Sequence, residues 1–95
     1  MSAALSADTV PRRRATVRMR NYRGTLLVGS GEYTLELTDS AALVFRCVDG
    51  TRSIGEIATC LAEAYDVSWD IAVQDVAELI DELARCDIAD LDAVP

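Results

Sequence analysis

The chain has 95 residues, of which 51% are apolar, and this length supports one small domain with a modest hydrophobic core. Its sixteen acidic and nine basic residues give a net charge of −7, which argues against a nucleic-acid-binding surface. No apolar run reaches the roughly 20 residues of a membrane helix, and the N-terminus lacks the pattern of a signal peptide. We therefore expect a soluble protein of the cytoplasm, with no nucleic-acid partner and no membrane partner.

The two signs of charge are separated along the sequence. Six arginines lie in the first quarter, whereas the chain from Ser68 onward holds eight acidic residues and one base, Arg85. An acidic half of this kind permits a basic partner. Solubility alone would also explain these acids, so the charge pattern leaves both interpretations open.

The N-terminal residues 1–13 show no periodicity, and we expect a flexible tail followed by a single domain over residues 14–92. Residues 15–20 alternate between apolar and polar, which predicts a first strand with Val17 and Met19 facing inward. A turn follows at residues 21–24.

Two further strands complete the predicted sheet. Residues 25–28 are apolar enough for a central strand. The glycines in residues 29–31 predict a tight hairpin. In residues 32–37 an apolar side chain alternates with a polar one, which predicts a third, half-buried strand.

The remainder of the chain has helical spacing. The first helix is predicted to begin at Thr38 or Asp39 and to end at the turn of residues 49–50. A second is predicted over residues 54–65, with Tyr65 the last of its core-facing positions. Ser53 and Glu56 have the spacing of a capping box for this second helix. A third helix is predicted from Ser68 to about Arg85, and its expected buried stripe is Trp69, Ala72, Val73, Val76, Ile80 and Leu83. Ile88 and Leu91 are expected to fold back over the core.

This order predicts an α+β fold in which a three-stranded antiparallel sheet precedes three helices (β-β-β-α-α-α). With short connections between the helices, the arrangement is similar to a winged helix-turn-helix. DNA binding is nevertheless disfavoured, because the third helix carries five acids and one base where a recognition helix needs basic or amide side chains.

No catalytic or metal-binding pattern is present in the sequence. The chain has no histidine, and its cysteines (Cys47, Cys60 and Cys86) lack CxxC spacing. We interpret them as small core residues in a reducing compartment. A nucleophile without a base is a poor catalyst, so we expect a protein that is not an enzyme and needs no cofactor.

The third strand is the informative element, because it is expected to lie at a sheet edge. An edge strand is either covered by another segment, protected from pairing by its side chains, or paired with a partner. A peptide can pair with it as a further strand. The residues alone leave two interpretations about equally supported. In one, the polar side chains of Thr34 and Glu36 discourage pairing with another strand; in the other, a peptide strand adds to this edge.

The segment from Leu35 to Ile57, with its Asp49-Gly50-Thr51-Arg52 turn, resembles the PqqD-like family. The resemblance extends over about residues 15–90. Members of this family are the recognition elements for ribosomally made, modified peptides (RiPPs), and they bind the leader of a precursor peptide. The resemblance implies that the leader lies antiparallel on the third strand, in a groove beside the third helix.

Carried onto this sequence, the resemblance implies a peptide-binding site made of one strand and one helix. The strand residues are Glu32, Tyr33, Thr34, Leu35, Glu36 and Leu37. The helix supplies apolar candidates and an acidic rim, namely Val76, Leu79, Ile80 and Leu83 with Asp75, Glu78 and Glu82.

The free-standing form resembles the leader-binding proteins of lasso-peptide pathways, which deliver a precursor to a separate leader peptidase. The acidic third helix favours a lysine-rich leader and therefore this assignment. Similar free-standing proteins serve a radical SAM enzyme in quinone-cofactor pathways, and this is the alternative. A winged-helix transcription regulator and an inert subunit of a larger enzyme complex are the remaining hypotheses.

Overall fold

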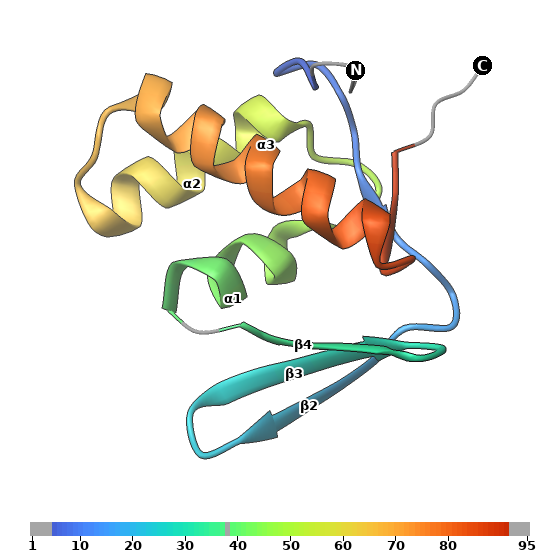
Figure 1. The fold of residues 1–95 in the computed structure, drawn as a ribbon. Coiled ribbons are helices and arrows are strands. Elements are labelled where there is room, and N and C mark those ends of the chain that lie inside the picture. Colours follow the sequence, from blue (N-terminus) through green and yellow to red (C-terminus); the bar gives the residue numbers. More distant parts are fainter. Residues whose placement is uncertain (1–4, 38, 92–95) are drawn as a thin grey trace.

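The computed structural model describes residues 5–37 and 39–91, and it has two layers (Figure 1). The sheet is antiparallel in the order β2 (Arg18–Tyr22), β3 (Thr25–Ser30) and β4 (Tyr33–Leu37). One face of it is covered by α1 (Asp39–Cys47), α2 (Ile54–Tyr65) and α3 (Trp69–Arg85). The predicted β-β-β-α-α-α order is confirmed, with two short strands added, β1 (Arg12–Arg13) and β5 (Ala89–Asp90).

Two tight hairpins fix the register of the sheet. Tyr22 pairs with Thr25 across a turn in which Arg23 and Gly24 both have positive φ, at 54° and 83°. Ser30 pairs with Tyr33 across a turn that begins with Gly31 at φ 59°. Positive φ at these positions matches the right-handed twist of paired strands, so short strands stay in a single register.

The core lies between the sheet and the helices. Leu26 and Val28 of the central strand are buried against α1, and Phe45 of that helix has no exposed surface. Each helix adds a buried stripe, and the helical members of the core are Ala42, Val44, Phe45, Ile54, Ile57, Ala58, Leu61, Ala72, Val76, Ile80 and Leu83. Ile88 is also buried and Leu91 packs against this core, as predicted.

The helix ends follow the local signals in the sequence. Ser53 and Glu56 form the predicted capping box at α2, with the Ser53 Oγ accepting from the Glu56 N–H at 3.1 Å. The Ser68 hydroxyl accepts from the Ile71 N–H at 3.3 Å and caps α3. Thr38 lies outside the described residues, and α1 begins at Asp39.

The N-terminal segment differs from the expected flexible tail. From Leu5 onward it packs on the domain, and Pro11 is fully buried. The carbonyls of Ala7 and Thr9 accept hydrogen bonds from the first N–H groups of α2, at 2.9 and 2.8 Å. β1 then pairs with β5. The packed region therefore begins before residue 14, because this segment supplies partners for backbone groups at the open end of α2.

Three side chains expected in the core lie partly outside it. Met19 is 43% exposed, although it pairs with the buried Val28, because β2 is an edge strand at the rim of the helical layer. Tyr65 and Trp69 are 44% and 46% exposed because Tyr65 ends α2 and Trp69 begins α3, on either side of the turn between them. The first strand itself spans Arg18–Tyr22 rather than residues 15–20.

None of the described helices is both long and apolar enough to cross a membrane.

The turn between α1 and α2 is organised by one carboxylate. Asp49 accepts hydrogen bonds from the N–H groups of Thr51 and Arg52, at 2.9 and 3.0 Å, and from the Thr51 hydroxyl at 2.9 Å. These bonds favour the charged form and lower the pKa of Asp49 from 3.8 to about 2. The Asp-Gly-Thr-Arg signature is therefore a turn that joins two helices.

Replacing this carboxylate should make stability depend less on pH. Asp49→Asn is expected to lower the free energy of unfolding at pH 7. Because the folded-state pKa of Asp49 is depressed, its stabilisation is complete above the unfolded-state value and is lost as the pH falls towards about 2. Urea denaturation of both proteins between pH 7 and pH 2 measures the difference, with Glu63→Gln as the control for one lost charge. A difference that stays constant down to pH 2 would contradict this role.

Candidate functional site

β4 is an edge strand, because within the described residues it pairs with β3 alone. The hairpin closes at Ser30 and Tyr33 across a two-residue turn, which makes this a hydrogen-bonded pair. Pairs in an antiparallel ladder alternate, so Thr34 and Glu36 occupy non-hydrogen-bonded positions opposite β3. Their own N–H and C=O groups therefore point away from β3, towards the open edge.

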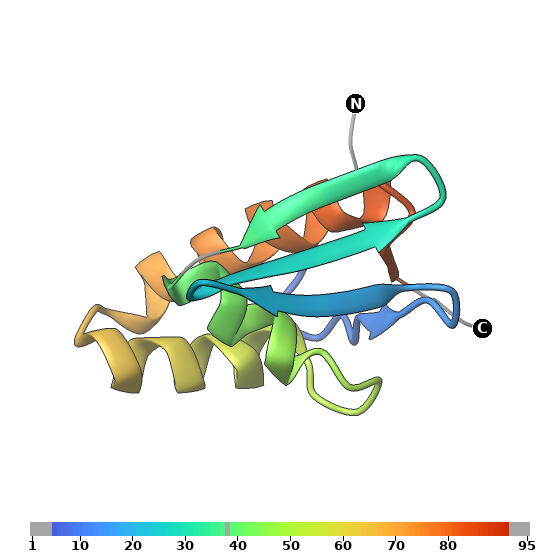
Figure 2. The same cartoon turned by 90° about the horizontal axis from the view of Figure 1, so that it is seen from below.

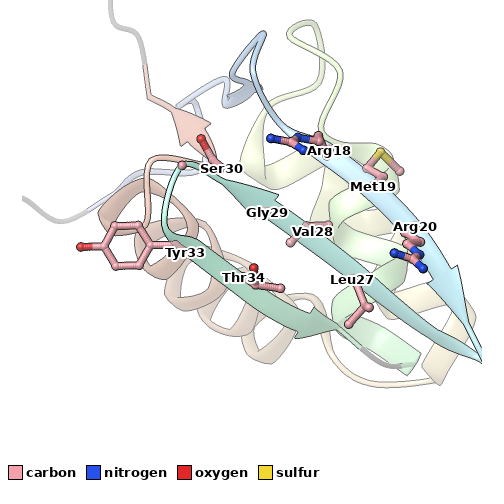
Figure 3. A pocket seen from close by; sticks show the side chains of 10 residues that line it. Arg18, Met19, Arg20, Leu27, Val28, Gly29, Ser30, Tyr33 and Thr34 are labelled. Carbon is pink, nitrogen blue, oxygen red and sulfur yellow. The ribbon is translucent and has the colours of Figure 1, made fainter.

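The side chains of β4 alternate between the two faces of the sheet. Leu37 is buried and Leu35 half-buried on the helical side, whereas Thr34 and Glu36 are exposed. Tyr33 is 50% exposed, and its ring projects beyond the strand (Figure 3). Glu32, expected in the strand, lies in the hairpin turn.

A surface hollow of about 290 Å³ lies between α1 and α3, next to the end of β4. Its α1 wall includes Ser40 and Ala41, which follow β4 closely in the chain, and Leu61 contributes from α2. The α3 wall is formed by Asp75, Glu78, Leu79 and Glu82. Viewed from below, α3 passes along the β4 side of the sheet (Figure 2). None of the residues that line the hollow belongs to β4, so the predicted groove between the third strand and the third helix is not lined by the strand.

The structure brings together only part of the predicted helical set. Leu79 is half-buried among the three exposed acids. Val76, Ile80 and Leu83 have no exposed surface, so they belong to the core and cannot line a groove. The spacing of these three residues places them on the core stripe, and Leu79 lies about 100° around the helix from Ile80.

Sequence reasoning missed the residues that α1 and α2 contribute to the hollow. Ser40, Ala41, Val44 and Leu61 come from segments whose patterns predict helices but say nothing about which helices meet. The one available signal was that α1 must start beside the end of β4, because the connection between them is so short.

Charge distinguishes the two edges of the sheet. All five residues of β2, the other edge strand, are exposed, and they include Arg18 and Arg20. Charged side chains on an edge discourage pairing with another strand. At the β4 side the nearest charged groups of the hollow are carboxylates. Basic groups are therefore attracted to the hollow beside β4 and repelled by the arginines of β2.

Residues 5–37 and 39–91 contain no cluster of three metal-ligating side chains. Burial and the neighbouring Cys60 thiol raise the pKa of Cys47, which favours the protonated thiol over the thiolate. All three cysteines are half-buried, which is less burial than expected for core residues.

Comparison with known proteins supports the same fold. Residues 24–89 match the family model for coenzyme PQQ synthesis protein D (PqqD). A PqqA binding protein from Xanthomonas campestris pv. campestris is 35% identical over 79 residues, which cover 81% of this chain and 86% of that protein. A bifunctional coenzyme PQQ synthesis protein C/D from Methylorubrum extorquens is 32% identical over 84 residues. The match covers 86% of this chain but only 23% of that protein's length.

Two solved structures share the fold. The solution NMR structure of the PqqD part of Methylobacterium extorquens PqqCD, described as a functional and stand-alone RiPP recognition element, has a TM-score of 0.78 at 30% identity. The alignment with this structure covers 92% of this chain and 95% of the solved chain. Lasso peptide synthetase B1, solved in complex with its leader peptide, has a TM-score of 0.74 at 23% identity, covering 90% of this chain and 99% of that chain. At this identity the second likeness concerns the fold alone.

Proposed function

The chain belongs to the PqqD family, and we propose that it is a non-catalytic protein that binds the leader of a ribosomally made precursor peptide. The observation that carries the proposal is the open β4 edge, with two residues presenting backbone groups beside a hollow. Relatives named for binding PqqA, and the 30%-identical structure described as a RiPP recognition element, support it.

In the proposed complex the leader adds to the sheet as a fourth strand, antiparallel to β4. Thr34 and Glu36 supply backbone hydrogen bonds that do not depend on the leader's sequence. Selection comes from side chains: Leu79 and Ala41 offer an apolar surface in the hollow, and Tyr33 packs over the strand. Asp75, Glu78 and Glu82 attract basic residues of the leader.

The bound leader would then be handed to a separate maturation enzyme. Relatives above 30% identity carry names from PQQ synthesis, which favours a PQQ-like pathway and its radical SAM enzyme. The acidic wall of the hollow favours a lysine-rich leader, and this observation keeps the leader peptidase of a lasso pathway as the second candidate. A binding comparison between a PqqA peptide and a lasso leader, by calorimetry on the same protein, separates the two.

A role as a winged-helix regulator of transcription is disfavoured by α3. The exposed side of this helix presents Asp75, Glu78 and Glu82, which would repel the phosphates of DNA.

Neutralising the acidic wall should weaken binding of whichever of the two peptides, PqqA or the lasso leader, this protein binds more tightly. The triple variant Asp75→Asn, Glu78→Gln, Glu82→Gln is expected to lose about tenfold in affinity at low salt, mostly through a slower on-rate. Stopped-flow fluorescence at several salt concentrations measures both effects, because the variant should also lose most of its salt dependence.

The matched control removes three acids near the turn between α2 and α3, at Glu63, Asp66 and Asp70. It changes the net charge by the same amount and should retain nearly the whole affinity. Equal losses in the two variants would show that only the overall charge of the protein matters, and would contradict a basic leader lying along α3.

A further inference from the structure

No other element of residues 5–37 and 39–91 covers the face of the sheet that points away from the helices (Figure 1). The strand register sets out its side chains in rows. Arg18 of β2 lies opposite Gly29, which lies opposite Thr34 of β4. In the next row Arg20 lies opposite Leu27, and Leu27 opposite Glu36. This outer face therefore carries two arginines along β2, a small apolar centre, and Thr34 and Glu36 along β4.

A hollow of about 370 Å³ occupies this outer face (Figure 3). Arg18, Arg20, Leu27 and Thr34 contribute to its lining, and Gly29 lies among them. A Cβ at Gly29 would lie 3.3 Å from the Tyr33 carbonyl oxygen and 3.4 Å from the Thr34 Oγ1. The hollow thus depends on glycine at this position, since a side chain would crowd β4 and fill the space.

The two arginines of this face are not used inside the domain. Arg14, Arg52 and Arg85 form ion pairs with Asp90, Asp49 and Asp81. Arg13 donates to the carbonyl oxygens of Phe45 and Arg46 at the end of α1, and the Arg46 guanidinium donates to Asn21. Within residues 5–37 and 39–91, Arg18 and Arg20 have no such partner, and β2 contains no acid. Guanidinium groups left free in a protein of net charge −7 mark a surface suited to carboxylates.

We propose that the outer face of the sheet docks an acidic segment of a partner protein. Its carboxylates pair with Arg18 and Arg20, and a small apolar side chain rests on Leu27 above Gly29. The acidic wall on α3 attracts a basic ligand, so the two surfaces select ligands of opposite charge from different sides of the molecule. Nucleic acid is a poorer occupant, because the net charge of −7 repels a long polyphosphate.

The test uses hexaglutamate as the probe and amide chemical shifts of the labelled full chain as the readout. We expect shifts at Arg18, Arg20 and residues 27–29, with little change on α2 and α3. The double variant Arg18→Ala, Arg20→Ala should bind about fivefold more weakly. The double variant Arg14→Ala, Arg85→Ala removes the same charge from residues that already form ion pairs, and it should bind as the parent does.

Equal weakening in the two double variants, or shifts spread over all the arginines, would overturn the proposal. Binding of hexathymidylate to the same amides with equal affinity would also overturn it, since that result indicates a surface for polyanions in general. Repeating the titration in the presence of the leader separates this inference from the proposed function. Hexaglutamate should bind with the same affinity in the presence and in the absence of the leader, and it should bind even if the leader does not. Displacement of one peptide by the other would contradict the proposal of two separate surfaces.

Discussion

Thr34→Pro should weaken leader binding by about 30-fold or more while the domain stays folded. The Thr34 N–H points to the open edge, so proline removes a donor that the leader needs and leaves the bonds between β3 and β4 intact. The proline ring also occupies space where the added strand would approach. Calorimetric titration with the leader measures the loss, and urea denaturation checks the fold.

The other edge of the sheet supplies the matched control. Met19 of β2 lies opposite Val28 of β3. Tyr22 and Thr25 close the hairpin as a hydrogen-bonded pair, and pairs alternate along the ladder, so the N–H of Met19 also points outward. Met19→Pro therefore removes an equivalent donor from the edge that we expect the leader to avoid, and should leave affinity unchanged. If Thr34→Pro binds the leader as tightly as Met19→Pro does, strand addition to β4 is wrong.

Phe45→Ala should destabilise the domain strongly, lowering the free energy of unfolding by about 3–5 kcal/mol. Phe45 has no exposed surface at the centre of the core. Its ring also lies 4.7 Å from the guanidinium carbon of Arg13, whose Nη2 donates to the Phe45 carbonyl at 3.1 Å. Loss of the ring thus leaves a cavity and loosens the N-terminal segment, in a domain whose total stability is about 5–15 kcal/mol.

Phe45→Leu retains most of the buried volume and should cost about 1–2 kcal/mol. Urea denaturation followed by circular dichroism compares the two variants with the parent. Similar losses for alanine and leucine would mean that the cavity at Phe45 contributes little, and that the core is organised around other residues.

The sequence predicts those parts of the fold that are specified by neighbouring residues. The capping box at Ser53, the hairpin at Gly31 and the Asp49 turn each depend on contacts within a few positions, and the structure contains all three. The three helices also follow from periodicity, because each buries one continuous stripe.

Features that depend on distant contacts could not be predicted in the same way. β1 and β5 have two residues each, too few for a periodic pattern, and they form only because the two ends of the domain meet. On α3 the periodicity placed Val76, Ile80 and Leu83 on the buried stripe and left Leu79 out, whereas the site carried over from the resemblance assigned the buried residues to the groove as well. The pattern could not show that Leu79 lines a hollow with residues of α1 and α2, because that depends on how the helices pack.

The most direct test of the central proposal is amide NMR mapping of the labelled protein with a leader peptide, namely whichever of a PqqA peptide and a lasso leader it binds more tightly. We expect the largest shifts at Tyr33–Leu37, with Leu79 and its acidic neighbours on α3 following at the same leader concentrations. Amides of α2 that face away from the hollow should remain unchanged. Shifts confined to α1 and α2, with residues 33–37 unaffected at saturation, would contradict leader binding by strand addition.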